Sequence, residues 1–206
     1  MLCFFSKISS SQTVYSTKEY CSFGFVGSMT SSDIYKDTIN YESGIGIGAG
    51  GCFTLTLSDK SNVGIEVVDI VKTIKRSHPI QKYYFNFVDI PLYYQYKLSE
   101  KVKFNIGLQY SVFAASKFDT LSQESTSGVK FAPLKTNVTN DIGILGGVEF
   151  GFLNNWFISG RYTMSLTPFT NKNTPYFGVF QLSLKCVVFK GHKQIFHKKG
   201  NGDPLF

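Results

Sequence analysis

The sequence predicts an all-β fold: a closed eight-stranded antiparallel up-and-down transmembrane β-barrel. Three observations predict it. Apolar residues alternate with small or polar ones at a period of two, the connections alternate between short and long, and only 17% of the 206 residues are charged. Soluble domains usually carry about 25% charged residues. No run reaches the roughly 20 apolar residues that a membrane helix needs, so a membrane-spanning part must consist of strands.

The alternation is clearest in the glycine-rich segment Gly44–Leu57. There, Ile45 and Ile47 fall on one face of a strand, and glycines, Cys52 and threonines fall on the other. Pro91 lies inside another such segment and lacks a ladder donor, so we expect a β-bulge there. The eight predicted strands are Glu19–Ser28, Gly44–Leu57, Val63–Lys72, Phe87–Leu98, Val102–Ala114, Asp141–Phe152, Trp156–Leu166 and Val179–Val188.

The connections between the predicted strands alternate in length. Tight turns are expected at Ser58–Asn62, Ser99–Lys101 and Asn154–Asn155, and the longest loop is expected at Lys117–Asn140. Barrels of the bacterial outer membrane have short periplasmic turns and longer external loops. The sequence therefore predicts this location, with lipid as the surrounding partner and both termini on the periplasmic side.

The volume of the barrel decides which face of each strand points inward. An eight-stranded barrel has an interior just wide enough for side chains to fill, so the large apolar set must face lipid and the small or polar set must face the lumen. Aromatic residues beside the short turns, Tyr94, Tyr96, Phe152 and Trp156, are expected to form a girdle. The predicted lumenal polar network is Glu66, Asp89, Lys97, Lys103, Gln109, Asp141, Glu149, Arg161 and Lys185.

The chain divides into three predicted parts. Residues 1–18 are expected to be a partial signal peptide or leader with a disordered N-terminus, 19–189 the outer-membrane β-barrel domain, and 190–206 a basic C-terminal tail. The net charge of +7 owes much to that tail. Basic residues are not massed on a folded face, so a nucleic-acid partner is not expected.

Several motifs match patterns found in catalytic or ligand-binding sites, but a structural role explains them better. Residues 46–51 match the dinucleotide pattern GxGxxG, yet a strand follows where that pattern needs a helix, so no cofactor is expected. No cysteine or histidine has metal-ligand spacing. Cys21 and Cys186 would lie on the outer face of neighbouring strands, either bridged or as free thiols. His78, in an external loop, is the one candidate for catalysis on lipid, and the chain is not expected to be an enzyme.

The stretch FNFVDIPLYYQYKLSEKVKFNIGLQYSVFAASK (Phe85–Lys117) resembles the PorT-like outer-membrane β-barrel proteins. DIGILGGVEFGF (Asp141–Phe152), the Arg161-Tyr162 pair and the last strand FQLSLKCVVF are also similar to that family. The resemblance covers about 24–189, and the chain continues past the last strand, where the family usually ends. The resemblance implies a barrel without a catalytic signature and a link to protein secretion.

Four functions remain open from the sequence. The first is a non-enzymatic barrel with a structural or envelope-interaction role, which presents loop 117–140 to envelope protein partners. The second is a small pore or transporter, and the third is an enzyme acting on lipid through His78. The fourth is a soluble ligand-binding β-barrel, which would require an apolar interior and a charged exterior.

Overall fold

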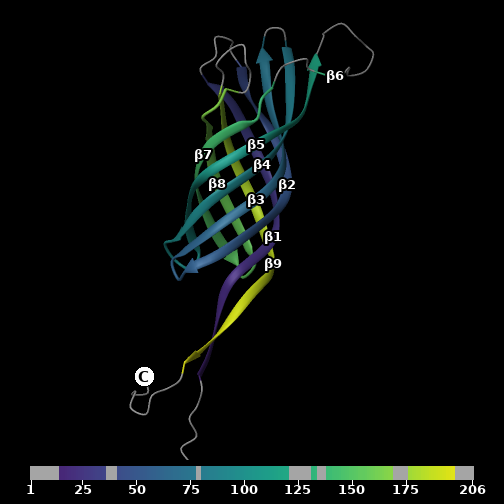
Figure 1. Cartoon of the computed structure of the whole chain (residues 1–206). Coiled ribbons are helices and arrows are strands. Elements are labelled where there is room, and N and C mark those ends of the chain that lie inside the picture. The colour runs from purple at the N-terminus through teal and green to yellow at the C-terminus, as the bar shows by residue number, and fades with distance from the viewer. Residues whose placement is uncertain are drawn as a thin grey trace, which may run out of the picture.

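The computed structural model describes residues 14–35, 41–77, 80–120, 131–133, 138–168 and 176–197. Within these ranges the protein is built of strands that form one antiparallel sheet (Figure 1). The strands are β1 (Val14–Tyr35), β2 (Tyr41–Ser58), β3 (Ser61–Ser77), β4 (Ile80–Lys97), β5 (Val102–Thr120), β6 (Phe131–Pro133), β7 (Asp141–Leu153), β8 (Trp156–Ser165) and β9 (Tyr176–His197).

Eight of the strands close into a ring. The order β4-β3-β2-β1-β9-β8-β7-β5 is completed by pairing of β4 with β5, and each neighbour in the ring is antiparallel. The short strand β6 pairs only with the end of β5, so it stands outside the ring. The predicted fold class, an eight-stranded up-and-down barrel, is confirmed.

The two ends of the barrel differ. The turns after β2, β4 and β7 are tight and lie at one end, which we call the short-turn end. A spanning strand needs about 9–11 residues. Strands β4 and β5 have 18 and 19 residues, so they continue well past a bilayer. Part of the predicted loop 117–140 is therefore strand, because β5 runs to Thr120 and β6 pairs with it.

Strands β1 and β9 also run past the predicted barrel limits of 19 and 189. They leave the short-turn end as a two-stranded ribbon, with Val14 opposite His197 (Figure 1). Lys190–His197 is thus strand rather than tail. The sequence did not predict this part because one-sided alternation is required only where one face meets lipid.

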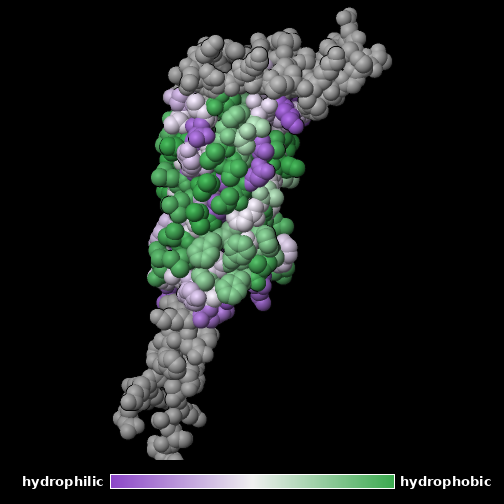
Figure 2. Space-filling model, turned by 45° about the vertical axis from the view of Figure 1, so that its right-hand side comes forward, coloured by the Kyte–Doolittle hydropathy of each residue, from purple (hydrophilic) through white to green (hydrophobic). Residues whose placement is uncertain are grey.

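The outer surface of the barrel is apolar. Ile106 and Leu108 are 68% and 56% exposed, whereas Asn105 and Gln109, which alternate with them on β5, are 7% and 2% exposed. Figure 2 shows hydrophobic residues covering the middle of the visible face, with hydrophilic residues gathered toward its two ends. Such an apolar surface is suited to contact with lipid, and a closed ring of strands pairs every backbone hydrogen-bonding group that lies in the lipid. The girdle residues Tyr94, Tyr96, Phe152 and Trp156 are exposed on this surface.

The lumen is not uniformly polar, in contrast to the prediction. A cluster of large apolar side chains fills it on the side away from the short turns, and we call it the apolar cluster. Its buried members are Val26, Val68, Ile70, Ile74, Phe85, Phe87, Phe177 and Val179. The prediction that large apolar residues all face outward was wrong here, because these side chains point into the lumen and bury one another there.

The predicted β-bulge at Pro91 is absent. The register of β3 against β4 is the same on both sides of Pro91, from Ile65↔Leu92 to Val68↔Asp89, and Pro91 pairs in register with Gln109 on β5. The pairs between those two positions are missing from the β3–β4 ladder. The ladder therefore tolerates the missing N–H by losing pairs rather than by inserting a residue.

The glycines of β2 allow two strands to approach closely. A Cβ added at Gly46 would overlap the carbonyl oxygen of Val71 on β3, and the β2–β3 pairing is interrupted between Ser43 and Gly48. The GxGxxG segment lies wholly within β2, as the sequence predicted. In the part of the chain that the structure describes, no helix is long and apolar enough to span a membrane.

Candidate functional site: a charged lumen

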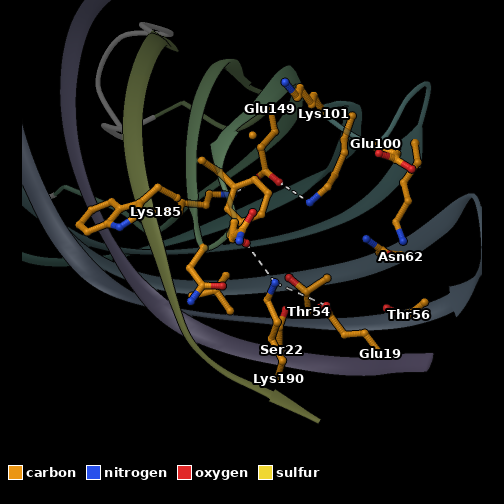
Figure 3. Close-up of a pocket in the computed structure, with 18 of the residues that line it drawn as sticks. Glu19, Ser22, Thr54, Thr56, Asn62, Glu100, Lys101, Glu149, Lys185 and Lys190 are labelled. Carbon is orange, nitrogen blue, oxygen red and sulfur yellow. Dashed lines mark hydrogen bonds and ion pairs between the residues drawn. The ribbon is translucent and has the colours of Figure 1, made fainter. Parts of the chain in front are cut away.

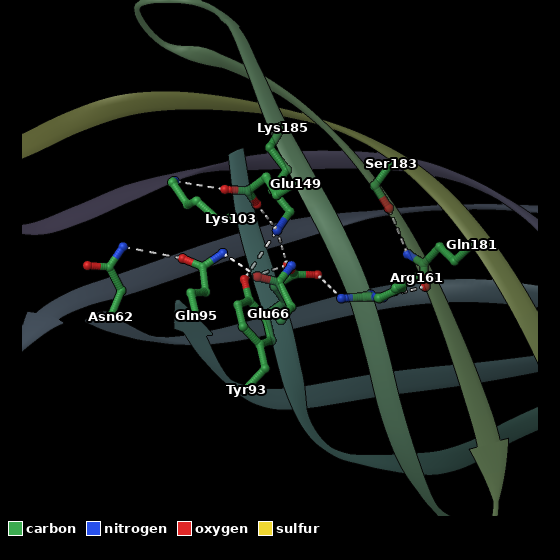
Figure 4. Close-up of polar contacts among 11 residues, drawn as sticks. Asn62, Glu66, Tyr93, Gln95, Lys103, Glu149, Arg161, Gln181, Ser183 and Lys185 are labelled. Atoms are coloured by element: carbon green, nitrogen blue, oxygen red, sulfur yellow. Dashed lines mark hydrogen bonds and ion pairs between the residues drawn. The ribbon is translucent and has the colours of Figure 1, made fainter. Parts of the chain in front are cut away.

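The half of the lumen nearer the short turns holds a cluster of charged side chains, which we call the ion network (Figure 4). Its centre is Glu66 on β3. Arg161 Nη1 lies 2.8 Å from Glu66 Oε2, Lys185 Nζ lies 2.7 Å from Oε1, and the Tyr93 hydroxyl donates to Oε1 at 2.7 Å. All of these side chains are buried. A buried carboxylate needs such partners, since an unpaired charge in this setting is costly.

Glu149 on β7 is the second carboxylate of the ion network. It accepts from Lys185 Nζ and Lys103 Nζ, both at 2.8 Å. Lys185 thus bridges Glu66 and Glu149, while Lys103 also lies over the Phe157 ring, 4.3 Å from its centroid. The network therefore sets three cations against two carboxylates, and the surplus is positive.

A cavity of about 1070 Å³ lies between the ion network and the short-turn end, and we call it the vestibule (Figure 3). Lys185 and Glu149 of the ion network form its inner wall, and residues of the short turns, including Lys101, form its mouth. Figure 3 shows Lys101, Lys185 and Lys190 on different sides of this space. The barrel is therefore a cup that is open at the short-turn end and filled with side chains farther in.

A second buried ion pair lies where the polar and apolar parts of the lumen meet. Lys72 Nζ is 3.2 Å from Asp89 Oδ1 and 4.4 Å from the centroid of the Phe87 ring. Gln109 donates to Asp89 Oδ2 at 2.8 Å, and the Thr163 hydroxyl donates to Gln109 Oε1 at 3.2 Å. The pair anchors the apolar cluster to the polar half.

Two predicted lumenal residues, Asp141 and Lys97, lie at opposite ends of the lumen. Asp141 is buried near the opposite end, where the hydroxyls of Ser165 and Thr167 donate to it. Lys97 is half-buried and lines the vestibule near its mouth. The structure therefore divides the predicted single network among four places: the ion network, the Lys72–Asp89 pair with Gln109, the Asp141 site, and Lys97 at the vestibule.

Sequence reasoning missed two central residues of the lumen. Lys72 was placed at the end of a predicted strand, and Tyr93 sits beside the outward-facing Tyr94 in a run of aromatics. The period-two alternation of each strand could have identified both residues, because residues an even number of positions apart share a face. Lys72 shares a face with Ile70 and Val68. Tyr93 shares a face with Asp89 and Gln95.

The cysteines and histidines form no reactive site among the described residues. Cys21, Cys52 and Cys186 are free thiols, and Cys21 is buried opposite Gly191 while Cys186 lies opposite Phe25. The possible Cys21–Cys186 bridge is therefore not formed, because Cys186 pairs with Phe25, four residues along β1 from Cys21. His78 lies outside the described residues. No group of histidine, cysteine and acidic residues in the described part could hold a metal ion.

Comparison with known proteins identifies the family. Residues 20–171 match the family model described as outer membrane protein beta-barrel domain. A search of curated proteins found no match. The family match is at this general level, and it does not single out the PorT-like proteins that the sequence resembles.

Solved structures with the same fold share little sequence with this chain. Ail, the attachment invasion locus protein of Yersinia pestis, is 13% identical with a TM-score of 0.52, and the match covers 82% of this chain and 99% of Ail. Neisserial surface protein A (NspA) is 13% identical with a TM-score of 0.51, at 82% and 99% coverage. The chain belongs to the outer membrane protein beta-barrel domain family and is a protein of the bacterial outer membrane.

Proposed function

We propose that this protein is a non-enzymatic barrel, closed to solutes, that holds its external segments at the cell surface for a structural or interaction role in the envelope. The observation that carries the proposal is the filled lumen. The apolar cluster and the ion network follow one another along the barrel axis, and both consist of buried side chains. A lumen blocked by packed rings and paired charges passes no solute, so other molecules can engage the barrel only at its two ends.

The external segment best suited to a partner is the region 117–140. Strand β6 pairs with residues 117–119 of β5, so a hairpin extends this region beyond the ring. Loops that carry binding residues are commonly held by a rigid scaffold in this way. An envelope protein is the proposed partner class, and membership of the PorT-like group with a role in secretion remains a prediction from the sequence.

A small pore is the second candidate, and the vestibule favours it because it already opens the part of the lumen between the ion network and the short-turn end. Conductance across a planar lipid bilayer separates the two candidates. The closed barrel predicts no stable current steps from the refolded protein. The variant F85A/F87A/F177A removes three rings but keeps the ion network, so it should also show no stable current steps, and a heat-modifiability gel tests whether it still forms a barrel. Stable current steps from the unmodified protein would overturn the closed-barrel proposal and favour the pore.

A further inference from the structure

We propose that the vestibule binds a short carboxylate-bearing peptide segment presented from the periplasm. The proposal deepens the function proposed above, since it assigns a partner class to the inner end of a closed barrel. The cavity volume of about 1070 Å³ lies just above the range for pockets that enclose small ligands, roughly 300–1,000 Å³, so a short peptide segment fits it. Because the ion network forms its inner wall, a ligand can enter only from the short-turn end.

Charge selects an acidic ligand. The charged residues that line the vestibule are six lysines and four carboxylate residues. At the inner wall, Lys103 and Lys185 share Glu149, and Lys103 is 15% exposed toward the cavity. At the mouth, the pair between Lys190 and Glu19 is loose at 3.7 Å. A surplus of cations between low-dielectric walls concentrates its field inside the cavity and attracts anions.

An orphaned acceptor indicates that the ligand also carries an N–H donor. The side chain of Asn62 lines the vestibule and is 4% exposed, and its Oδ1 has no hydrogen-bond partner among the described residues. Its Nδ2 donates only a long bond, 3.4 Å, to Gln95 Oε1. Buried polar atoms are nearly always paired, so the Oδ1 is suited to accept a donor brought by a ligand. A peptide supplies a backbone N–H together with acidic side chains.

Cys52 offers a direct assay, because it lines the vestibule as a free thiol. A variant with serine at Cys3, Cys21 and Cys186 keeps this single thiol. In lipid nanodiscs, its rates of reaction with anionic and cationic methanethiosulfonates are each divided by the rate of the same reagent with mercaptoethanol. We expect the anionic reagent to be favoured by roughly threefold or more.

Charge-removing variants test the cause of that preference. K101Q, at the exposed turn, and K103Q should each lower the ratio of anionic to cationic rates. K75Q removes the same charge from an exposed position on β3 outside the vestibule and should leave the ratio unchanged. Because Lys103 pairs with Glu149 and its variant could fail to fold, K101Q alone suffices. A ratio that does not respond to K101Q, or responds equally to K75Q, would overturn the proposal.

Protection of Cys52 tests the ligand class. An acetylated peptide of three aspartates should slow modification of Cys52 by about fivefold at saturation, and a matched peptide of three lysines should not. The added substitution N62A should weaken protection without altering the charge preference. Equal protection by both peptides, or none by either, would overturn the proposal. Conductance of the same single-thiol protein reports separately on the closed barrel, so failure of one idea is distinguishable from failure of the other.

Discussion

The two halves of the lumen fill the same narrow space with opposite chemistry. Toward the short turns, carboxylates and cations from five strands pair around Glu66 and Glu149. Farther in, aromatic rings pack edge to face, with Phe85 and Phe87 both against Phe177. Paired charges depend on each partner being present, whereas apolar packing depends on volume. The two halves should therefore respond differently to the same kind of substitution, and this difference can be measured.

The largest effect is expected from removing the centre of the ion network. E66A leaves Arg161 without its carboxylate and removes one of the two that hold Lys185, so we expect a loss of about 5 kcal/mol in the free energy of unfolding. Urea unfolding of the barrel refolded in lipid vesicles measures it. E66Q retains an acceptor and should lose less. A loss below about 1 kcal/mol for E66A would mean that the network does not stabilise the barrel.

A somewhat smaller effect is expected in the apolar cluster. F87A removes a fully buried ring and leaves a cavity, at a cost of about 3–4 kcal/mol in the same assay. F25A is the matched control, because Phe25 is 59% exposed on the outer face, where lipid can occupy the space. Equal losses for the two variants would show that the ring of Phe87 is not packed inside the lumen.

The boundary between the halves can be tested with a double-mutant cycle. K72M leaves Asp89 buried without its cation and should cost about 3 kcal/mol. The double variant K72M/D89N removes both charges, keeps a partner for Gln109 and should cost less than K72M alone. The coupling energy from the cycle measures the pair. If the two substitutions are additive, Lys72 and Asp89 do not interact.

The smallest effect is expected at the mouth of the vestibule. Glu19 and Lys190 are 3.7 Å apart, with side chains 39% and 29% exposed. Exposed pairs contribute about 0–1 kcal/mol, so E19Q should change the free energy of unfolding by less than about 1 kcal/mol. That change should vanish in about 1 M salt, where charges are screened within about 3 Å. The effect of E66A should persist there, since buried pairs are screened much less.

The barrel and its orientation could be predicted from the sequence because lipid imposes a strict rule on each spanning residue. Ile106, Leu108 and Phe150 face out, and the residues between them face in. The rule does not say what fills the lumen. Phe85 and Phe177 are buried in the apolar cluster, and no pattern in the sequence marks the large apolar residues that turn inward. The ribbon of β1 and β9 continues past the barrel, where one-sided alternation is not required.

The sequence predicts which polar residues face the lumen, but not which of them contact one another. Glu66 comes from β3, whereas Arg161 and Lys185 come from the neighbouring strands β8 and β9, and β1 and β2 separate β3 from β9 around the ring. Their contact across the lumen depends on the stagger of each strand, and alternation carries no information about stagger. Asp89 illustrates this limit: its partner Lys72 was not among the predicted residues, and the pair became visible only once the register of β3 against β4 was known.

The pairing of β1 with β9 has a consequence for how the barrel is made. It joins the segments farthest apart in the described chain, from Val14↔His197 to Tyr35↔Tyr176, whereas most other neighbours in the ring are joined by nearby turns. A hairpin can form as soon as its two strands exist, but β1 can pair with β9 only after Tyr176–His197 has been synthesised. Contacts of such high sequence separation are slow to form. Until β1 and β9 pair, each offers a free edge to which another strand can bind.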